Sequence, residues 1–289
     1  MDRNVSPSLN NHLESLLEDA IQAVRIGAAI DQKHFDTVRS RRFAVKDTHS
    51  DWNPVTEVDQ LAEEAITTFL AEAHRGHHFL GEENVAGQVE QAEHLWIVDP
   101  IDGTANYIHG IPHYGVSVGY ALNGQVMVAA CLDPGRNELF TAVRDQGSWL
   151  NGQRISVSGV TRLEDAIIAT GFYYDRGAMM ERTLESIRRL FGERIHGIRR
   201  NGSAVLDLCW TAAGRFDAYF EYELGPWDFA PAALVLQEAG ATVSRTDGSA
   251  LTMSVGTLAA ATPGIYRPFI QVIGDGLTVP SMATSPLSS

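Results

Sequence analysis

Two aspartates, Asp99 and Asp102, stand where an apolar segment meets a turn. Residues 96–98 are apolar, Pro100 lies between the two acids, and Gly103 follows them. An apolar run that ends at Pro and Gly predicts a strand followed by a tight turn, so both carboxylates are expected at the end of the strand. Paired carboxylates provide the hard oxygen ligands that Mg²⁺ takes when it bridges to phosphate. These residue types and their spacing favour Mg²⁺-dependent phosphoryl chemistry.

The residues after this turn favour a short helix that begins at Thr104. A helix N-terminus presents free backbone N–H groups and the positive end of the helix dipole, which together suit a phosphate group. A D-P-x-D sequence is also typical of a solvated turn, and the fragment alone favours that interpretation. The longer sequence around it decides between the two.

The stretch WIVDPIDGTANYIHGIP, residues 96–112, resembles the signature of the inositol monophosphatase family. The family pattern is W-I/V-x-D-P-I/L-D-G-T-x-N-F-x-x-G-x-P, and Tyr107 in place of Phe is the one departure. Three more segments match the family in its order: PVTEVD at 54–59, FLGEEN at 79–84 and GPWDFAPAALVLQEAGA at 225–241. Members of this family are Mg²⁺-dependent phosphomonoesterases, and many are inhibited by lithium.

The resemblance implies two or three Mg²⁺ ions in the site, for which Mn²⁺ can substitute. Glu82, Asp99 and the backbone carbonyl of Ile101 are expected to hold one ion, and Asp99, Asp102 and Asp228 to hold a second. Without cations, such a group of carboxylates would repel one another and raise one another's pKa values. A water activated by the metals is then expected to attack phosphorus, with no covalent phosphoenzyme.

The resemblance also implies which side chains position this water and the substrate. Thr104, oriented by Asp59, and Glu82 are expected to position and deprotonate the water. The segment at 199–221 resembles the part of the family that contacts the substrate; on its own it would be interpreted as a buried helix followed by an edge strand. The substrate-binding residues implied are Asp102, Gly103, Thr104, Gly202, Ser203, Ala204 and Glu221.

These features predict a phosphoric monoester hydrolase that acts on small polyol phosphates, with inositol 1-phosphate as the favoured substrate. Histidinol phosphate and fructose 1,6-bisphosphate are alternative substrates on the same fold. An alternative of another class is a non-catalytic metal-binding scaffold, against which the presence of four carboxylates and Thr104 counts.

Composition agrees with this interpretation. The chain has 289 residues, of which 44% are hydrophobic, and it lacks a run of about 18 apolar residues, as expected of a soluble protein. The net charge of −14 disfavours a nucleic-acid-binding protein. We expect a cytoplasmic protein, because no secretory signal is found, and a homodimer, because family members form homodimers. Cys131 and Cys209 are expected to be buried and reduced.

The periodicity of apolar residues predicts the main elements. Residues 9–30 and 57–73 are expected to form amphipathic helices, with a polar loop at 46–54 between them. Strands are expected at 115–122, 125–133 and 137–143, because Asn123-Gly124 predicts a hairpin between the first two. Strands and helices then alternate as far as a helix that begins near Asp228.

The order of these elements predicts an α+β fold with layered helices and strands around one core. The resemblance specifies this as a five-layered αβαβα sandwich. Residues 1–274 are predicted to form a single catalytic domain, with an α+β half over about 1–150 and an α/β half over about 151–274. Residues 275–289 are rich in Ser, Pro and Thr and are expected to be disordered.

Some residues depart from the family pattern. The spacing of Lys46 implies an insertion at 49–52, and Phe172 or Tyr173 replaces a polar residue on the leaving-group side. His109 and His113 could bind zinc, but Pro112 interrupts their register, and structural or substrate-side roles are favoured. Three further histidines lie close together in the sequence and are expected to form a solvated surface cluster: His74, His77 and His78.

Overall fold

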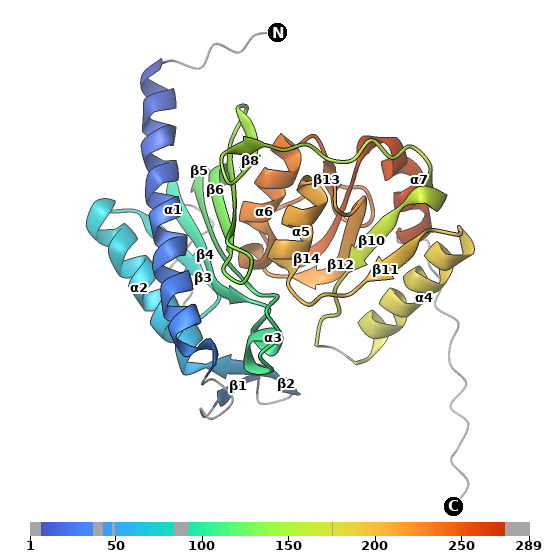
Figure 1. Cartoon of the computed structure of the whole chain (residues 1–289), viewed down its shortest axis with the longest axis horizontal. Coiled ribbons are helices and arrows are strands. Elements are labelled where there is room, and N and C mark those ends of the chain that lie inside the picture. The colour runs from blue at the N-terminus through green and yellow to red at the C-terminus, as the bar shows by residue number, and fades with distance from the viewer. Residues whose placement is uncertain (1–6, 37–42, 48–49, 84–91, 175, 275–289) are drawn as a thin grey trace, which may run out of the picture.

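Two β-sheets alternate with three layers of helices in the computed structural model, which describes residues 7–36, 43–47, 50–83, 92–174 and 176–274 (Figure 1). From one side to the other, the layers are two helices, a seven-stranded sheet, two helices, a five-stranded sheet and two helices. The predicted αβαβα sandwich is therefore confirmed. The expected tail at 275–289 lies outside the described residues.

The seven-stranded sheet has the order β3-β4-β5-β6-β7-β8-β9 and is antiparallel except for the parallel pair β3 and β4. The turn between β5 and β6 is formed by Asn123 and Gly124, both with positive φ (50° and 77°), as a two-residue hairpin requires. The strands are β3 (His78–Gly81), β4 (His94–Asp102), β5 (Gly115–Leu122), β6 (Gln125–Asp133), β7 (Glu138–Val143), β8 (Gly147–Leu150) and β9 (Gln153–Arg154).

Helices α1 (Pro7–Phe35) and α2 (Glu57–Ala73) cover one face of this sheet (Figure 1). Successive side chains of a strand point to opposite faces, and β4 uses both. Trp96 and Val98 pack against α1 and α2, whereas Ile97 packs on the other face, against the central helices. Burial on both faces holds the end of β4, where Asp99 lies, in a fixed position.

The five-stranded sheet has the order β11-β10-β12-β14-β13. Strand β12 pairs in parallel with β10 and antiparallel with β14, so it lies at the centre of the sheet. Helices α4 (Ala178–Gly192) and α7 (Pro263–Ile273) cover its outer face. The strands are β10 (Ile167–Thr170), β11 (Gly197–Arg199), β12 (Ala218–Leu224), β13 (Thr242–Ser244) and β14 (Gly256–Ala261), and a 3₁₀ turn, Leu163–Asp165, precedes β10.

Helices α5 (Ala204–Ala212) and α6 (Pro226–Glu238) form the central layer between the two sheets (Figure 1). Both are apolar around most of their circumference, as a helix enclosed on all sides must be. Their N-terminal ends carry Ser203 and Asp228, so the central layer brings polar groups from late in the sequence to the end of β4. Cys131 and Cys209 are both free and buried in this region, as predicted.

The structure corrects the first of two local predictions and confirms the second, with a small shift in where the helix begins. The polar loop expected at 46–54 instead contributes to a hairpin of β1 (Phe43–Asp47) and β2 (Ser50–Thr56). The helix expected to begin near Asp228 begins at Pro226, because proline suits the first helical position. Asp228 is therefore the third residue of α6, and its Oδ2 accepts a hydrogen bond from the backbone N–H of Gly225 at 2.6 Å.

Of the three histidines predicted to form a solvated cluster, His78 is exposed as expected, whereas His74 and His77 are partly buried. His74 contacts Asp19 (Nε2–Oδ2 2.9 Å). The ring of His77 is stacked on that of His94, with centroids 4.6 Å apart, and its Nδ1 accepts a hydrogen bond from Trp96 Nε1 at 3.1 Å. These partners come from separate elements, so sequence periodicity does not reveal them.

We expect His77 to reduce stability in mild acid. Burial, and then the neighbouring histidines, lower its pKa from 6.5 to about 4. Between these values the unfolded chain binds a proton that the folded chain does not, so stability is lost as the pH falls below 6.5. His77→Gln keeps an acceptor for Trp96 and should reduce the loss of Tm between pH 7.5 and 5. The control is His78→Gln at an exposed position. An equal reduction of the Tm loss in this variant would show that the acid sensitivity does not come from His77.

Candidate active site

The end of β4 presents the two aspartates that the sequence singles out. Asp99 is fully buried and Asp102 is 8% exposed. The pairing of β4 with β5 is irregular between these two residues, which lets both carboxylates leave the regular alternation of the strand. The backbone N–H of Ile101 donates to Asp99 Oδ1 at 3.1 Å, fixing the orientation of that carboxylate.

Gly103 lies at a close contact between the two halves of the chain. Its φ of 92° is in the left-handed region, and it precedes the short helix α3 (Thr104–Ile108) that the sequence predicted. A Cβ atom here would lie 2.9 Å from the carbonyl oxygen of Gly202. A glycine is therefore needed both for the turn and for the approach of the segment that leads into α5.

Asp102 joins the end of β4 to the start of α5. Its Oδ2 accepts hydrogen bonds from the hydroxyl of Ser203 and from the backbone N–H of Val205, the latter at 2.7 Å. Burial raises the pKa of Asp102 to about 7, and the negative charge of Glu82 adds to this, while the hydrogen bonds oppose it. Asp102 is thus a buried carboxyl group held at the junction of the two halves.

A group of three carboxylates converges here. One oxygen each of Asp99, Asp102 and Asp228 lies within 4.8 Å of the others. Burial raises the pKa of Asp228 well above its usual value, and the charges of Glu82 and Asp102 raise it further. Hard carboxylate oxygens at this spacing fit a divalent cation such as Mg²⁺ or Mn²⁺, whose charge offsets their repulsion.

A second carboxylate group lies beside the first. Glu82 follows β3, and one of its oxygens lies within 4.8 Å of oxygens from Asp59 and Glu83. The predicted ligands Glu82, Asp99 and Ile101 all line one cavity. The carboxylate oxygens that form a common group with Glu82 are, however, those of Asp59 and Glu83. Glu83 was not among the predicted site residues, although its position next to Glu82 was the available signal. The predicted division of ligands between two ions stays a prediction.

Thr104 lies between the two carboxylate groups. Its hydroxyl contacts Asp59 Oδ1 at 3.2 Å and the carbonyl oxygen of Ile101 at 3.1 Å. Asp59 is fully buried near the start of α2, and Thr104 is 7% exposed at the start of α3. The structure therefore places Asp59 where it can orient the Thr104 hydroxyl, as the sequence predicted.

A cavity of about 420 Å³ opens from these carboxylates. Phe172 and Tyr173, one of which is expected to replace a polar residue of the family pattern, line it, as do His109, Arg176 and Arg200. Neither arginine was among the predicted site residues. All seven residues predicted to contact the substrate line the same cavity: Asp102, Gly103, Thr104, Gly202, Ser203, Ala204 and Glu221.

Glu221 lies on β12 on the side of the cavity formed by the second half of the chain. Burial raises the pKa of its carboxyl group to about 8; the charge of Asp102 adds to this shift, while Tyr219 and Arg200 oppose it. The phenol of Tyr219 donates to Glu221 Oε2 at 2.5 Å. Tyr219 was not among the predicted site residues, although its position two residues before Glu221 places it on the same face of the strand.

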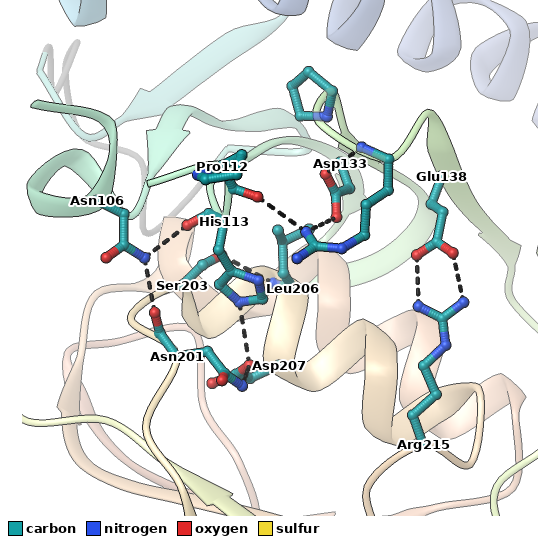
Figure 2. A network of polar contacts seen from close by, with 12 residues as sticks. Asn106, Pro112, His113, Asp133, Glu138, Asn201, Ser203, Leu206, Asp207 and Arg215 are labelled. Carbon is teal, nitrogen blue, oxygen red and sulfur yellow. Dashed lines mark hydrogen bonds and ion pairs between the residues drawn. The ribbon is translucent and has the colours of Figure 1, made fainter. Parts of the chain in front are cut away.

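A polar network holds α3 to the segment before α5 (Figure 2). Nδ2 of Asn106 donates to the carbonyl oxygens of His113 and Asn201 at 2.7 and 2.8 Å. His113 Nε2 lies 3.3 Å from Asp207 Oδ1, and both side chains are buried. His113 thus fits the structural role favoured over a zinc ligand, and the network fixes the spacing between Gly103 and Gly202.

Comparisons with known proteins agree with the geometry. A sequence profile of the Inositol monophosphatase family matches residues 12–273. A protein of Pseudomonas aeruginosa named Nus factor SuhB is 42% identical over 223 residues, which cover 76% of this chain and 82% of that protein. A Rhizobium meliloti protein named inositol-1-monophosphatase is 35% identical over 259 residues, 90% of this chain and 96% of that protein.

A solved structure extends this similarity to three dimensions. The extragenic suppressor protein suhB of Bartonella henselae matches with a TM-score of 0.84 at 32% identity, covering 91% of this chain and all of that chain (100%). Within the described part of the present chain, every helix is too short or too polar to cross a lipid bilayer.

Proposed function

Because the chain belongs to the inositol monophosphatase family, a family of phosphomonoesterases, we propose that it hydrolyses small polyol phosphates, with inositol 1-phosphate as its substrate. The observation that carries this proposal is the convergence of Asp99, Asp102 and Asp228 in a cavity that Glu221 also lines. The three aspartates suit a cation that binds a phosphate, and Glu221 suits a hydroxyl group of the leaving polyol.

We assign the divalent cations to the carboxylates at the cavity's end. Asp99, Asp102 and Asp228 would hold one ion, and Glu82, Asp99 and the carbonyl of Ile101 a second, with Mg²⁺ as the physiological ion and Mn²⁺ as a substitute. When bound, such ions supply positive charge to the phosphoryl group and lower the pKa of a water molecule. The proposal includes inhibition of the enzyme by lithium ions.

The chain's own residues then orient the reactants. Asp59 accepts the hydrogen bond of the Thr104 hydroxyl, so a lone pair of that oxygen is free to hold the attacking water. Glu82 takes the proton of that water. The backbone N–H groups of Gly103 and Thr104, at the start of α3, bind phosphate oxygens. Asp102 and Glu221 accept hydrogen bonds from the hydroxyl groups of the polyol.

The Glu221→Gln variant tests the substrate side of this proposal. At pH 9, above the pKa of about 8, the wild-type residue is an ionised acceptor, and losing one charge-assisted hydrogen bond should cost about 1–2 kcal/mol. The KM for inositol 1-phosphate should rise accordingly, with a smaller effect at pH 6.5, where the neutral carboxyl group resembles an amide. The hydroxyl-free p-nitrophenyl phosphate should respond little. Equal losses on both esters would make Glu221 a structural residue.

Phosphate release from a panel of esters tests the function itself. We expect turnover in Mg²⁺ with inositol 1-phosphate, and kcat/KM highest for this ester when histidinol phosphate and fructose 1,6-bisphosphate are compared. A preference for either of the others would replace the substrate but keep the mechanism. An absence of turnover on every ester, with cation binding retained, would support a non-catalytic scaffold.

A second candidate function is that of a Nus factor, the name given to the Pseudomonas aeruginosa relative that is 42% identical to this chain. A protein could act as a Nus factor and also hydrolyse phosphate esters. A gene-deletion strain complemented with Asp99→Asn separates the two, because a defect restored by an inactive variant does not depend on turnover. The expected cytoplasmic location and homodimer remain predictions.

A further inference from the structure

The carboxyl group of Glu221 occupies a confined place in the cavity. It is 7% exposed and lies on β12, the central strand of the five-stranded sheet. A Cβ atom on Gly171, which follows β10, would overlap this carboxylate. The absence of a side chain at Gly171 therefore makes the space that Glu221 fills, and the carboxylate cannot move toward β10.

Tyr219 holds the same carboxylate from the other direction. The two residues share one face of β12, because side chains alternate along a strand. The phenol donates to Glu221 Oε2 at 2.5 Å, and the ring is 1% exposed, within the core formed by the central helices. A ring packed in this way delivers its hydroxyl group to a fixed point.

This hydrogen bond has two chemical consequences. The last torsion of a glutamate is broad, so a donor on one oxygen is needed to fix the plane of the carboxylate. With Oε2 bound to Tyr219, Oε1 is the oxygen available to the polyol. The bond also favours the ionised form of Glu221 and so opposes the effect of burial, which raises its pKa to about 8.

We propose that Tyr219 is a positioning residue that orients Glu221 toward a hydroxyl group of the leaving polyol, and so contributes to the preference for polyol phosphates over hydroxyl-free esters. This inference rests on the proposed function. Tyr219 also lines the cavity, and its hydroxyl group acts through Glu221. The space at Gly171 and the bond from Tyr219 together define one position of the carboxylate.

Tyr222 provides a matched control on the same strand. Its side chain lies on the opposite face of β12, among the residues packed against α4 and α7, and it is 4% exposed. Its hydroxyl contacts Ser186 Oγ at 2.5 Å and donates to the carbonyl oxygen of Ile273 at 2.8 Å. Tyr222→Phe therefore removes a buried, hydrogen-bonded phenol oxygen from β12 without touching the cavity.

The test compares Tyr219→Phe, Tyr222→Phe and Glu221→Gln in the full chain with Mg²⁺ at pH 9. KM and kcat are measured for inositol 1-phosphate and for p-nitrophenyl phosphate. Tyr219→Phe should raise KM for inositol 1-phosphate about fivefold to tenfold, with a much smaller change in kcat and in both constants for p-nitrophenyl phosphate. Tyr222→Phe should lower Tm without separating the two esters.

Combining the two cavity variants sharpens the result. If Tyr219 acts through Glu221, the Tyr219→Phe/Glu221→Gln pair should raise KM little more than Glu221→Gln alone, since residues in contact are not additive. Gly171→Ala, which displaces the carboxylate from the other side, should also raise KM for inositol 1-phosphate selectively. This variant keeps the phenol oxygen and tests the position of Glu221 independently of it.

The results that would contradict the role of Tyr219 differ from those that would contradict the proposed function. Equal losses on both esters in Tyr219→Phe, or fully additive effects in the double variant, would overturn the positioning role and leave Tyr219 as a structural residue. Wild-type kinetics in Tyr219→Phe, with inositol 1-phosphate hydrolysed normally, would overturn this inference alone. Failure of the wild-type protein to hydrolyse inositol 1-phosphate would overturn the proposed function and the inference with it.

Discussion

Replacing Asp99 by Asn is expected to lower kcat by about 10³-fold, because it removes charge that stabilises the transition state. Asp99 is fully buried in the group that it forms with Asp102 and Asp228. The amide oxygen of Asn can still accept the hydrogen bond from the backbone N–H of Ile101, so the local backbone is kept. Without cations the variant should be at least as stable as the wild type, since one of several crowded anions is lost.

The measurements are kcat in Mg²⁺ and Tm in chelator. Asp133→Asn is the matched control, because Asp133 is also fully buried but is paired with Arg136 (Nη1–Oδ2 2.8 Å) outside the cavity. This change should lower Tm and leave most of kcat. The opposite pattern at Asp99, with lower Tm and retained activity, would identify Asp99 as a structural residue.

Removal of divalent cations is expected to abolish turnover. The candidate ligands are all oxygens, so Mg²⁺ or Mn²⁺ should restore activity, and Ca²⁺ should restore it poorly because its longer bonds and looser geometry misplace the water. The ligands must be deprotonated to bind, and the pKa of Asp102 is raised to about 7 by burial. The apparent affinity for Mg²⁺ should therefore be greater at pH 8 than at pH 6.

Titration of chelated protein with each cation checks this expectation through phosphate release and through Tm. A cation that binds the folded chain alone should raise Tm in proportion to its occupancy. The Asp99→Asn variant should show a smaller rise. Full activity in excess chelator would rule out the mechanism.

The parts of the fold set by local sequence were predicted closely. The hairpin of β5 and β6 has the predicted bounds, because Asn123-Gly124 determines both the turn and the register. The helix at 57–73 was also predicted with its observed bounds, since its apolar residues recur at helical spacing. The hairpin of β1 and β2 was missed because its polar sequence lacks the alternation that indicates a strand.

The site could be predicted where a family motif carried it, and Asp228 and Glu221, from separate motifs, line the same cavity as the end of β4. Asp99, Asp102 and Thr104 come from a single stretch, and the structure brings them together as expected. Glu83 was not selected because its importance depends on Asp59, which lies in another element. Tyr219 was not selected although its partner Glu221 lies two residues later on the same strand. The burial and stacking of His77 likewise depend on tertiary contacts, which the spacing of histidines along the chain cannot reveal.

The late position of α5 and α6 in the sequence has a consequence for synthesis on the ribosome. Asp102 is completed by partners 101 and 103 positions further along the chain, at Ser203 and Val205, and Asp228 follows later still. Domains fold as units, and exposed strands and apolar faces favour aggregation until folding is complete. A nascent chain that ends before α5 therefore has no partner for the inner face of its seven-stranded sheet, which includes Ile97. We expect ribosome-bound chains that end before α5 to be inactive and to bind chaperones. Once the full-length chain is released, it should become active and no longer bind them.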